Sequence, residues 1–344
     1  MKNILCKDKF AYLLTDRNLR RYFSNVDIAE GVLIIAKSQT YFTDARYFCA
    51  AKDKLKKVNV ECRLYRGIDS VFDFLSDLGI ENIYVDYRTT TVKEYEEYKS
   101  KGVKVFDCAD ELERLMSVKD EFEIESIKKA CKITQTAYHE AIRTVKKGMT
   151  ERELKETLDK LSLEYGADEI AFETIVAFGA NSAVPHHETG ETVLEDNMPI
   201  LVDMGCKING YCSDLTRTAF FGEPDEEFTK VYDAVLNANL IAEKNISVGM
   251  SLINADKIAR DYLTKAGYGE YFTHSLGHGV GLEIHEFPTL SPKGNGEIKE
   301  NMIFTVEPGV YLDYKFGIRI EDTVLINGGK VERLFSDEKK LIIL

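Results

Sequence analysis

Several residue types and patterns that mark particular classes of protein are scarce in this sequence. It contains no tryptophan and only six prolines, and no run approaches the roughly 18 apolar residues that a membrane-spanning helix needs. The opening residues, MKNILCKDKF, lack the apolar core of a secretory signal. We therefore expect a cytoplasmic protein without a membrane partner.

Cysteine and positive charge are also in short supply. The seven cysteines are scattered, odd in number and without a Cys-x-x-Cys pair, which is more typical of reduced thiols than of a disulfide framework or a zinc knuckle. Lys and Arg number 45 against 58 Asp and Glu, so the formal net charge is −13. Because phosphate backbones and anionic lipids attract basic surfaces, this charge argues against nucleic acid as a partner.

The length of 344 residues predicts two domains, since one domain commonly takes about 150 residues. In the first part, the short apolar runs GVLIIA, VECRLY, NIYVD and VKVF predict strands, while residues 69–78 and 91–100 predict helices. The segment YFTDARYFCAA predicts a strand that passes into a helix, with Asp44 and Arg46 more often a local ion pair than a functional pair. The first domain should therefore be α/β.

Charged helical sequence replaces these strands near residue 115, so we predict domains at residues 1–115 and 116–344. The second domain contains an internal similarity, in which Gly-Met-Thr and Gly-Met-Ser each precede an amphipathic helix. The two glycines, Gly148 and Gly249, are 101 residues apart. We predict an α+β domain of two similar halves, each helix-helix-strand, joined near residues 222–225.

Three of the six histidines lie in one segment, residues 274–286, which reads HSLGHGVGLEIHE. Glycines on both sides of His278 leave room for a ligand or another backbone to approach. Apolar and polar residues alternate over residues 282–285, a pattern that predicts a strand. A lone histidine is weak evidence for a site, and the acidic residues elsewhere in the domain strengthen it.

Four carboxylates interrupt apolar stretches of the second domain where apolar side chains are expected. Asp203 and Asp214 belong to two successive predicted strands, Glu307 follows a third, and Glu321 lies within a fourth. A buried carboxylate without a partner would become protonated, whereas two divalent cations would balance four such charges. With His278 as the fifth ligand, this oxygen-rich set favours Mn²⁺, with Co²⁺, Zn²⁺ or Fe²⁺ as alternatives.

The ordered motifs VDMG, SDLTR, HSLGHGVGLEIHE, TVEPG and GIRIED resemble those of the metal-dependent peptidases of the creatinase/aminopeptidase P/prolidase group. The resemblance is strong over residues 120–335, and YFTDARY extends it more weakly into the first domain. It implies a pita-bread catalytic fold behind a creatinase-type N-terminal domain. It also implies hydrolysis of Xaa-Pro bonds in peptide substrates, two metal ions in each chain and a homodimer.

The resemblance assigns a role to each candidate ligand. Asp203 and Asp214 would bind one metal ion, and Asp214 would bridge to the other. His278 and Glu307 would complete the second site, with Glu321 as a second bridge. Glu307 would also carry a proton from the attacking water.

Further catalytic roles follow from the same motifs. His285 and His186 would contact the substrate, with His186 preferred by motif over the adjacent His187. Arg319 would orient a carboxylate ligand, and period-two spacing places its side chain on the same strand face as that of Glu321. His274 would either support the ligands or be purely structural.

Other functions remain open at this stage. A dipeptidase and an aminopeptidase P-like enzyme for longer peptides differ in how the pocket beyond proline is closed, which these motifs do not decide. Methionine aminopeptidase is disfavoured by the long first domain, and creatinase because it works without metals. A binding module or a metal-free scaffold on the same fold is disfavoured by the complete ligand set.

Overall fold

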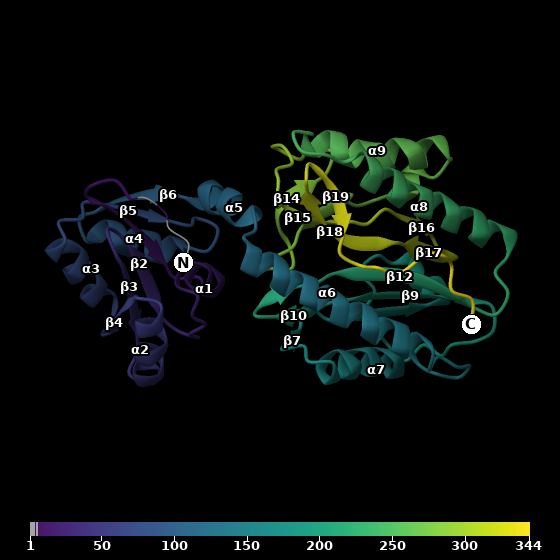
Figure 1. The fold of residues 1–344 in the computed structure, drawn as a ribbon, viewed down its shortest axis with the longest axis horizontal. Coiled ribbons are helices and arrows are strands. Elements are labelled where there is room, and N and C mark those ends of the chain that lie inside the picture. The colour runs from purple at the N-terminus through teal and green to yellow at the C-terminus, as the bar shows by residue number, and fades with distance from the viewer. Residues whose placement is uncertain (1–3, 5) are drawn as a thin grey trace. The chain divides into compact units, whose positions relative to one another are not determined.

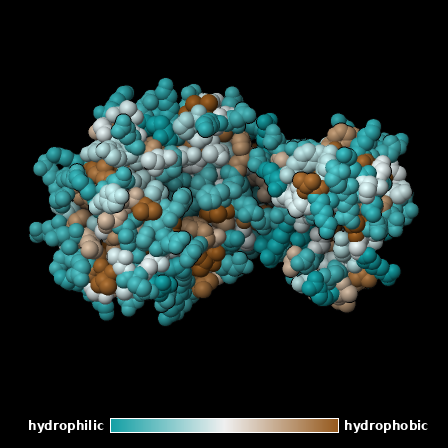
Figure 2. All heavy atoms as spheres, turned by 180° about the vertical axis from the view of Figure 1, so that it is seen from behind, coloured by the Kyte–Doolittle hydropathy of each residue, from teal (hydrophilic) through white to brown (hydrophobic). Residues whose placement is uncertain are grey.

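The computed structural model describes residues 4 and 6–344, and the chain divides into two compact units between Leu115 and Met116 (Figure 1). No helix in this described part of the chain is long and apolar enough to cross a membrane. On the face drawn in Figure 2, hydrophobic residues form small groups separated by hydrophilic ones. The core of each unit therefore lies inside, and each unit is described separately below.

The first unit is built on one mixed sheet with the strand order β4-β3-β2-β1-β5-β6. The predicted strands and helices of this region are confirmed, because their apolar residues pack into one core that includes Leu13, Ile34 and Phe42. Asp44 and Arg46 form a local ion pair, with 2.5 Å between Arg46 Nη2 and Asp44 Oδ2. The elements are β1 (Phe10–Leu14), α1 (Arg17–Ser24), β2 (Val32–Ile35), β3 (Gln39–Thr43), α2 (Phe48–Lys57), β4 (Glu61–Leu64), α3 (Ile68–Asp77), β5 (Asn82–Val85), α4 (Val92–Ser100), β6 (Lys104–Asp107) and α5 (Ala109–Ser117).

The second unit packs four long helices against a large sheet with the path β14-β13-β15-β18-β12-β9-β8, and β19 pairs with β18. Smaller sheets are formed by β11-β10-β7 and by the hairpin β16-β17. The helices are α6 (Glu121–Ile142), α7 (Glu151–Glu164), α8 (Glu226–Asn245) and α9 (Leu252–Lys265), with 3₁₀ turns at η1 (Gly179–Ala183) and η2 (Gly269–Tyr271). The strands are β7 (Glu169–Ile170), β8 (Ile175–Phe178), β9 (Met198–Met204), β10 (Cys206–Ile208), β11 (Tyr211–Cys212), β12 (Leu215–Phe221), β13 (Gly277–Gly279), β14 (Glu286–Leu290), β15 (Ile303–Val306), β16 (Gly309–Leu312), β17 (Phe316–Arg319), β18 (Glu321–Asn327) and β19 (Lys330–Arg333).

The predicted internal repeat is confirmed by both element order and hydrogen bonding. The first half runs α6, α7, β8, β9, β12, and the second runs α8, α9, β13, β15, β18, with β12 and β18 paired at the centre of the sheet. In the first half, Gly148 N donates to Leu194 O at 2.9 Å, and in the second Gly249 N donates to Ile298 O at 2.9 Å. The halves meet between β12 and α8, at the predicted junction.

Two local predictions were wrong. Residues 282–285 do not form a strand, because the Gly281 N–H bonds to the carbonyl of Glu283 at 3.0 Å in a tight turn, and β14 begins only at Glu286. The motif GIRIED is also not one continuous strand. The chain changes sheets at Ile320, because β17 pairs with β16 whereas β18 pairs with β12 and β15.

Candidate metal centre

Five ligand-type side chains come from five strands that are neighbours in the large sheet. His278 lies on β13, Glu307 directly follows β15, Glu321 begins β18, Asp214 directly precedes β12, and Asp203 lies near the end of β9. In the sheet these strands follow one another as β13-β15-β18-β12-β9. The sheet therefore gathers at one place residues that are spread over more than a hundred positions of the sequence.

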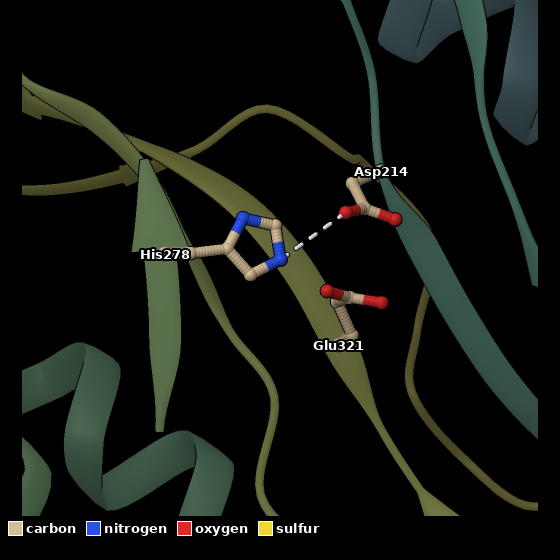
Figure 3. A group of neighbouring side chains, drawn as sticks. All are labelled: Asp214, His278 and Glu321. Carbon is tan, nitrogen blue, oxygen red and sulfur yellow. Dashed lines mark ion pairs between the residues drawn. The ribbon is translucent and has the colours of Figure 1, made fainter. Parts of the chain in front are cut away.

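Three of these side chains are close enough to hold one metal ion. One ligand atom from each of Asp214, His278 and Glu321 lies within 4.8 Å of the others, and Figure 3 shows the imidazole pointing toward the two carboxylates. His278 Nε2 is 3.6 Å from Asp214 Oδ2 and 3.3 Å from Glu307 Oε1. Strand pairing places Asp203 beside this group. Asp203 on β9 lies opposite Thr216 on β12, and Thr216 lies opposite Glu321 on β18.

The buried carboxylates of this cluster repel one another, and a positive charge among them would stabilise their ionised forms. Burial raises the pKa of Asp214 well above its usual range, and the negative charges of Glu321 and Asp203 raise it further. The pKa of Glu321 is raised in the same way, by burial and then by Glu307 and Asp203. Oδ1 of Asp203 is buried without a hydrogen-bond partner in the part of the chain that the structure describes. Divalent cations would offset the repulsion between the carboxylates and could bind Oδ1 of Asp203. The residues therefore fit a metal centre.

The remaining two members of the cluster have matching properties. Burial raises the pKa of Glu307 to about 7, although Arg319 opposes the rise, and Thr305 Oγ1 donates to Glu307 Oε1 at 2.9 Å. Burial also lowers the pKa of His278, and this effect outweighs the backbone hydrogen bond to Gly279 and the charge of Asp203, both of which raise the pKa. This lowering favours the neutral imidazole, which is the form that binds metal ions.

Arg319 connects several of these groups. Its Nη2 donates to Asp203 Oδ2 at 2.6 Å, and its Nε donates to Thr216 Oγ1 at 3.0 Å. The Thr216 hydroxyl donates in turn to Glu321 Oε2 at 2.6 Å. One guanidinium therefore orients two of the carboxylates, directly in one case and through a hydroxyl in the other.

A chain of hydrogen bonds extends from Arg319 to His274. Arg319 Nη1 donates to the Tyr311 hydroxyl at 2.8 Å, and that oxygen is 2.9 Å from His274 Nε2. His274 Nδ1 is 2.8 Å from the carbonyl of Ser275, which can only accept, so Nδ1 carries the proton and Nε2 accepts from Tyr311. Burial lowers the pKa of His274 to about 3, and the charge of Arg319 lowers it further. The sequence analysis did not identify Tyr311, because this residue lies outside the recognised motifs.

The histidines proposed to contact substrate lie beside this cluster with exposed side chains. The ring of His285 is 4.3 Å from that of His278, centroid to centroid. Partial burial of the His285 ring lowers its pKa, and the proximity of His278 and His186 lowers it further. His187 points elsewhere, with its Nε2 3.0 Å from Glu151 Oε2. His186 is near enough to the cluster for its charge to lower the pKa of Glu307 and of His285.

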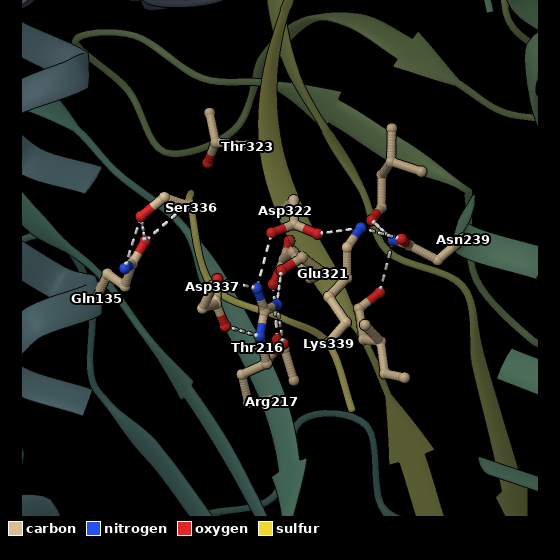
Figure 4. A network of polar contacts seen from close by, with 12 residues as sticks. Gln135, Thr216, Arg217, Asn239, Glu321, Asp322, Thr323, Ser336, Asp337 and Lys339 are labelled. Atoms are coloured by element: carbon tan, nitrogen blue, oxygen red, sulfur yellow. Dashed lines mark hydrogen bonds and ion pairs between the residues drawn. The ribbon is translucent and has the colours of Figure 1, made fainter. Parts of the chain in front are cut away.

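A buried ion network lies behind the central strands, on the sheet face opposite Thr216 and Glu321 (Figure 4). Arg217 Nη2 donates to Asp322 Oδ1 at 2.8 Å, and Arg217 Nη1 donates to the carbonyl of Glu321 at 2.6 Å. Burial alone would raise the pKa of Asp322, but Arg217 and Lys339 hold it at about 2. Lys339 Nζ lies 2.6 Å from Asp322 Oδ2.

This network reaches the C-terminal segment as well as the sheet. Asp337 Oδ2 accepts from Arg217 Nε at 2.9 Å, and Lys339 Nζ donates to Glu243 Oε1 on α8 at 2.8 Å. Sequence reasoning missed these residues, although charged Arg217 within an apolar strand was a usable signal. The network holds the backbone from which Glu321 projects.

Comparisons with known proteins agree with this geometry. The model of the metallopeptidase family M24 matches residues 125–328, and that of the creatinase/prolidase N-terminal domain matches residues 7–118. A Xaa-Pro dipeptidase of Pyrococcus furiosus is 37% identical over 325 residues, which cover 93% of this chain and 92% of that protein.

Solved structures extend the likeness to the fold. The Xaa-Pro dipeptidase from Bacillus anthracis superposes with a TM-score of 0.93 at 35% identity, covering 97% of this chain and 95% of that one. The X-Pro aminopeptidase from Thermotoga maritima MSB8 gives a TM-score of 0.91 at 35% identity, with the same coverage. These likenesses confirm the family resemblance and the predicted fold class.

Membership of such a family implies divalent metal ions, and the buried carboxylates and the imidazole of His278 are suitable ligands for them. The chain is a metallopeptidase and belongs to family M24, with a creatinase/prolidase N-terminal domain before its catalytic unit.

Proposed function

We propose that this chain is an exopeptidase that hydrolyses Xaa-Pro bonds, with dipeptides as its preferred substrates. The convergence of five ligand-type side chains from neighbouring strands on one buried centre carries the proposal. The printed activity of the Pyrococcus furiosus and Bacillus anthracis relatives supplies the substrate class. We propose two divalent ions, Mn²⁺ before Co²⁺, Zn²⁺ or Fe²⁺, with the ligands Asp203, Asp214, His278, Glu307 and Glu321.

The residues around the centre suit hydrolysis of a tertiary amide. Two such ions would polarise the scissile carbonyl and lower the pKa of the attacking water. Glu307, with its pKa raised to about 7 by burial, can accept the proton of that water and deliver it to the leaving nitrogen. The nitrogen of a proline leaving group carries no hydrogen in the peptide, so this delivery is required.

His285 and His186 complete the proposed reaction. Both rings are exposed beside the cluster, so they can donate hydrogen bonds to the oxygen on which negative charge develops. Arg319 keeps Asp203 and Glu321 in place during the reaction. Each step therefore has a residue with suitable chemistry and position.

All five proposed ligands lie in the second unit, so the first unit needs another task. We propose that the protein is a homodimer in which the first unit of one subunit closes the substrate pocket of its partner. The described cysteines, including buried Cys206 and Cys212, form no disulfide, which is compatible with the cytoplasmic location that we propose.

A second candidate function is that of a Xaa-Pro aminopeptidase acting on longer peptides. It is favoured by the similarity to the Thermotoga maritima X-Pro aminopeptidase, whose identity of 35% equals that of the Bacillus anthracis dipeptidase. The two functions differ in whether the pocket beyond proline accepts further residues.

The deciding experiment compares hydrolysis of Ala-Pro, Ala-Pro-Ala and Ala-Ala by the complete protein, stripped of metal and then reloaded with Mn²⁺. Faster cleavage of Ala-Pro supports the dipeptidase, and faster cleavage of Ala-Pro-Ala supports the aminopeptidase. Hydrolysis of Ala-Ala at the rate of the proline peptides, or equal activity without metal, would contradict both.

A further inference from the structure

We infer that Glu151 and His187 form a positioning pair that fixes the backbone on which His186 is presented to the substrate. The inference rests on the proposed function, because it assigns His186 to the substrate side of the metal centre. It assigns a function to His187, the second of the two adjacent histidines, and to the buried Glu151 on α7.

Glu151 is fully buried, and its carboxylate organises the segment between β8 and β9. Its Oε1 accepts from the backbone N–H of Phe178 at 2.8 Å and from the side-chain amide of Asn181 at 2.8 Å. Its Oε2 accepts from the backbone N–H of Gly190 at 3.0 Å and from Nε2 of His187 at 3.0 Å. One carboxylate thus holds four points of the chain between Phe178 and Gly190.

The residue on the other side of His186 is also held. The carbonyl of Pro185 accepts from Arg319 Nη1 at 3.2 Å, and Arg319 bonds at the same time to Asp203. His186 therefore lies between a neighbour tied to the metal centre and a neighbour tied to Glu151. Because its own side chain is exposed while both flanking residues are anchored, its ring is placed without being enclosed.

The internal repeat shows that the fold itself does not require an acid at this position. Glu151 follows the N-cap Thr150 of α7, and Leu252 follows the N-cap Ser251 of α9. The framework bond is the same in both halves, since the backbone N–H of each residue donates to a carbonyl of the following segment at 3.0–3.1 Å. The carboxylate of Glu151 is thus present only in the first half, and there it holds the segment that contains His186.

A double-mutant cycle separates positioning from general stability. The variants are His186→Ala, His187→Ala and the double variant, with exposed Glu188→Ala as the matched control in the same segment. We expect His187→Ala to lower kcat about 10- to 100-fold, since a misplacement of about 1 Å can cost about 10²-fold, with metal content unchanged. In the His186→Ala background, the same change should lower kcat less than about twofold.

Conservative variants keep the test decisive if His187→Ala fails to fold. His187→Gln retains a side-chain N–H that can reach Glu151, so it should recover most of the lost kcat. Glu151→Gln, with exposed Glu156→Gln on the same helix as its control, should lower kcat and shift the imidazole NMR resonances of His186 in metal-free protein. This shift is independent of turnover.

Each alternative outcome has a distinct meaning. An equal loss of kcat from His187→Ala in both backgrounds would overturn the inference, as would wild-type kcat in His187→Ala or unchanged His186 resonances in Glu151→Gln. Wild-type kcat in His186→Ala would remove the role of His186 and the inference with it. Failure of the wild-type protein to cleave Ala-Pro and Ala-Pro-Ala would instead contradict the proposed function.

Discussion

The two halves of the catalytic unit share a framework and differ in chemistry. Each half supplies one carboxylate from the end of a strand and one from the start of the next central strand: Asp203 and Asp214 in the first half, Glu307 and Glu321 in the second. Only the second half adds an imidazole to the proposed ligand set, that of His278. The centre therefore lies at the seam where β12 and β18 pair, and neither half can complete it alone.

The halves also position their histidine-bearing segments by different means. In the first half, Glu151 on α7 holds the segment that carries His186. In the second half, Asp256 on α9 accepts from the backbone N–H of Leu276 at 3.1 Å and pairs with Arg260, whose Nη2 donates to the carbonyl of His274 at 2.8 Å. The comparison teaches that the repeat preserves the scaffold while each half acquires its own polar anchors.

The largest expected effect tests whether both halves are needed for the centre. Glu321→Gln and Asp214→Asn each remove one carboxylate charge from the seam without changing side-chain size. Because metal ions contribute several kcal/mol of charge stabilisation, we expect kcat/KM to fall at least about 10³-fold in each, with loss of bound metal measured by elemental analysis. Exposed Glu297→Gln is the control. Full metal content in either variant would contradict the conclusion that both halves supply metal ligands.

The second effect concerns the buried ion network behind the two central strands. The position in β12 that pairs with Asp322 is apolar Leu215, so only β18 carries this buried acid. Asp322→Asn leaves Arg217 and Lys339 without a full counter-charge, and we expect the free energy of unfolding to fall by about 3–5 kcal/mol. Urea unfolding measures it, with exposed Asp313→Asn as the control. A loss below about 1 kcal/mol would show that the network is dispensable.

A somewhat smaller effect distinguishes ligands from substrate contacts within the second half. His285→Ala should lower kcat about 10²- to 10³-fold, because it removes a donor to the developing oxyanion. Metal content should stay at the wild-type level, unlike that of His278→Ala, which loses a proposed ligand. Loss of metal in His285→Ala, or full activity, would assign His285 a different role.

The smallest effect is a dependence of stability on pH that originates in the second half. Burial raises the pKa of Glu243 to about 7, from 4.5 for an ordinary glutamate, and Asp322 adds to the rise while Lys339 opposes it. The folded protein therefore binds this proton more tightly than the unfolded chain does. The contribution of this group to the free energy of unfolding must fall as pH rises from about 4.5 to about 7.

Glu243→Gln removes that contribution. The free energy of unfolding of the variant minus that of the wild-type protein should therefore increase between about pH 5 and about pH 8. Urea unfolding of both metal-free proteins at several pH values gives this difference. A difference that stays constant or decreases over this range would show that Glu243 does not retain its proton on folding.

Local pattern was sufficient for much of the fold. The strands and helices of the first unit were predicted because alternating and helical periodicities report directly which side chains face a core. The repeat was visible because Gly148 and Gly249 end equivalent turns with positive φ. The strand predictions were wrong at residues 282–285, where the chain turns, and at Ile320, where it changes sheets. Apolar and polar residues alternate through both places, but alternation does not indicate which strands are hydrogen-bonded to each other.

The sequence by itself determined the family, the ligand types and the two-half plan, because these depend on residue identity and order along the chain. Only the tertiary structure showed that His187 contacts Glu151, which lies 36 residues away in the sequence. The contacts of Arg319 with Asp203 and of Arg217 with Asp322 arise in the same way. Such contacts join segments that are distant in sequence, and a buried polar group finds its partner only when the chain has folded.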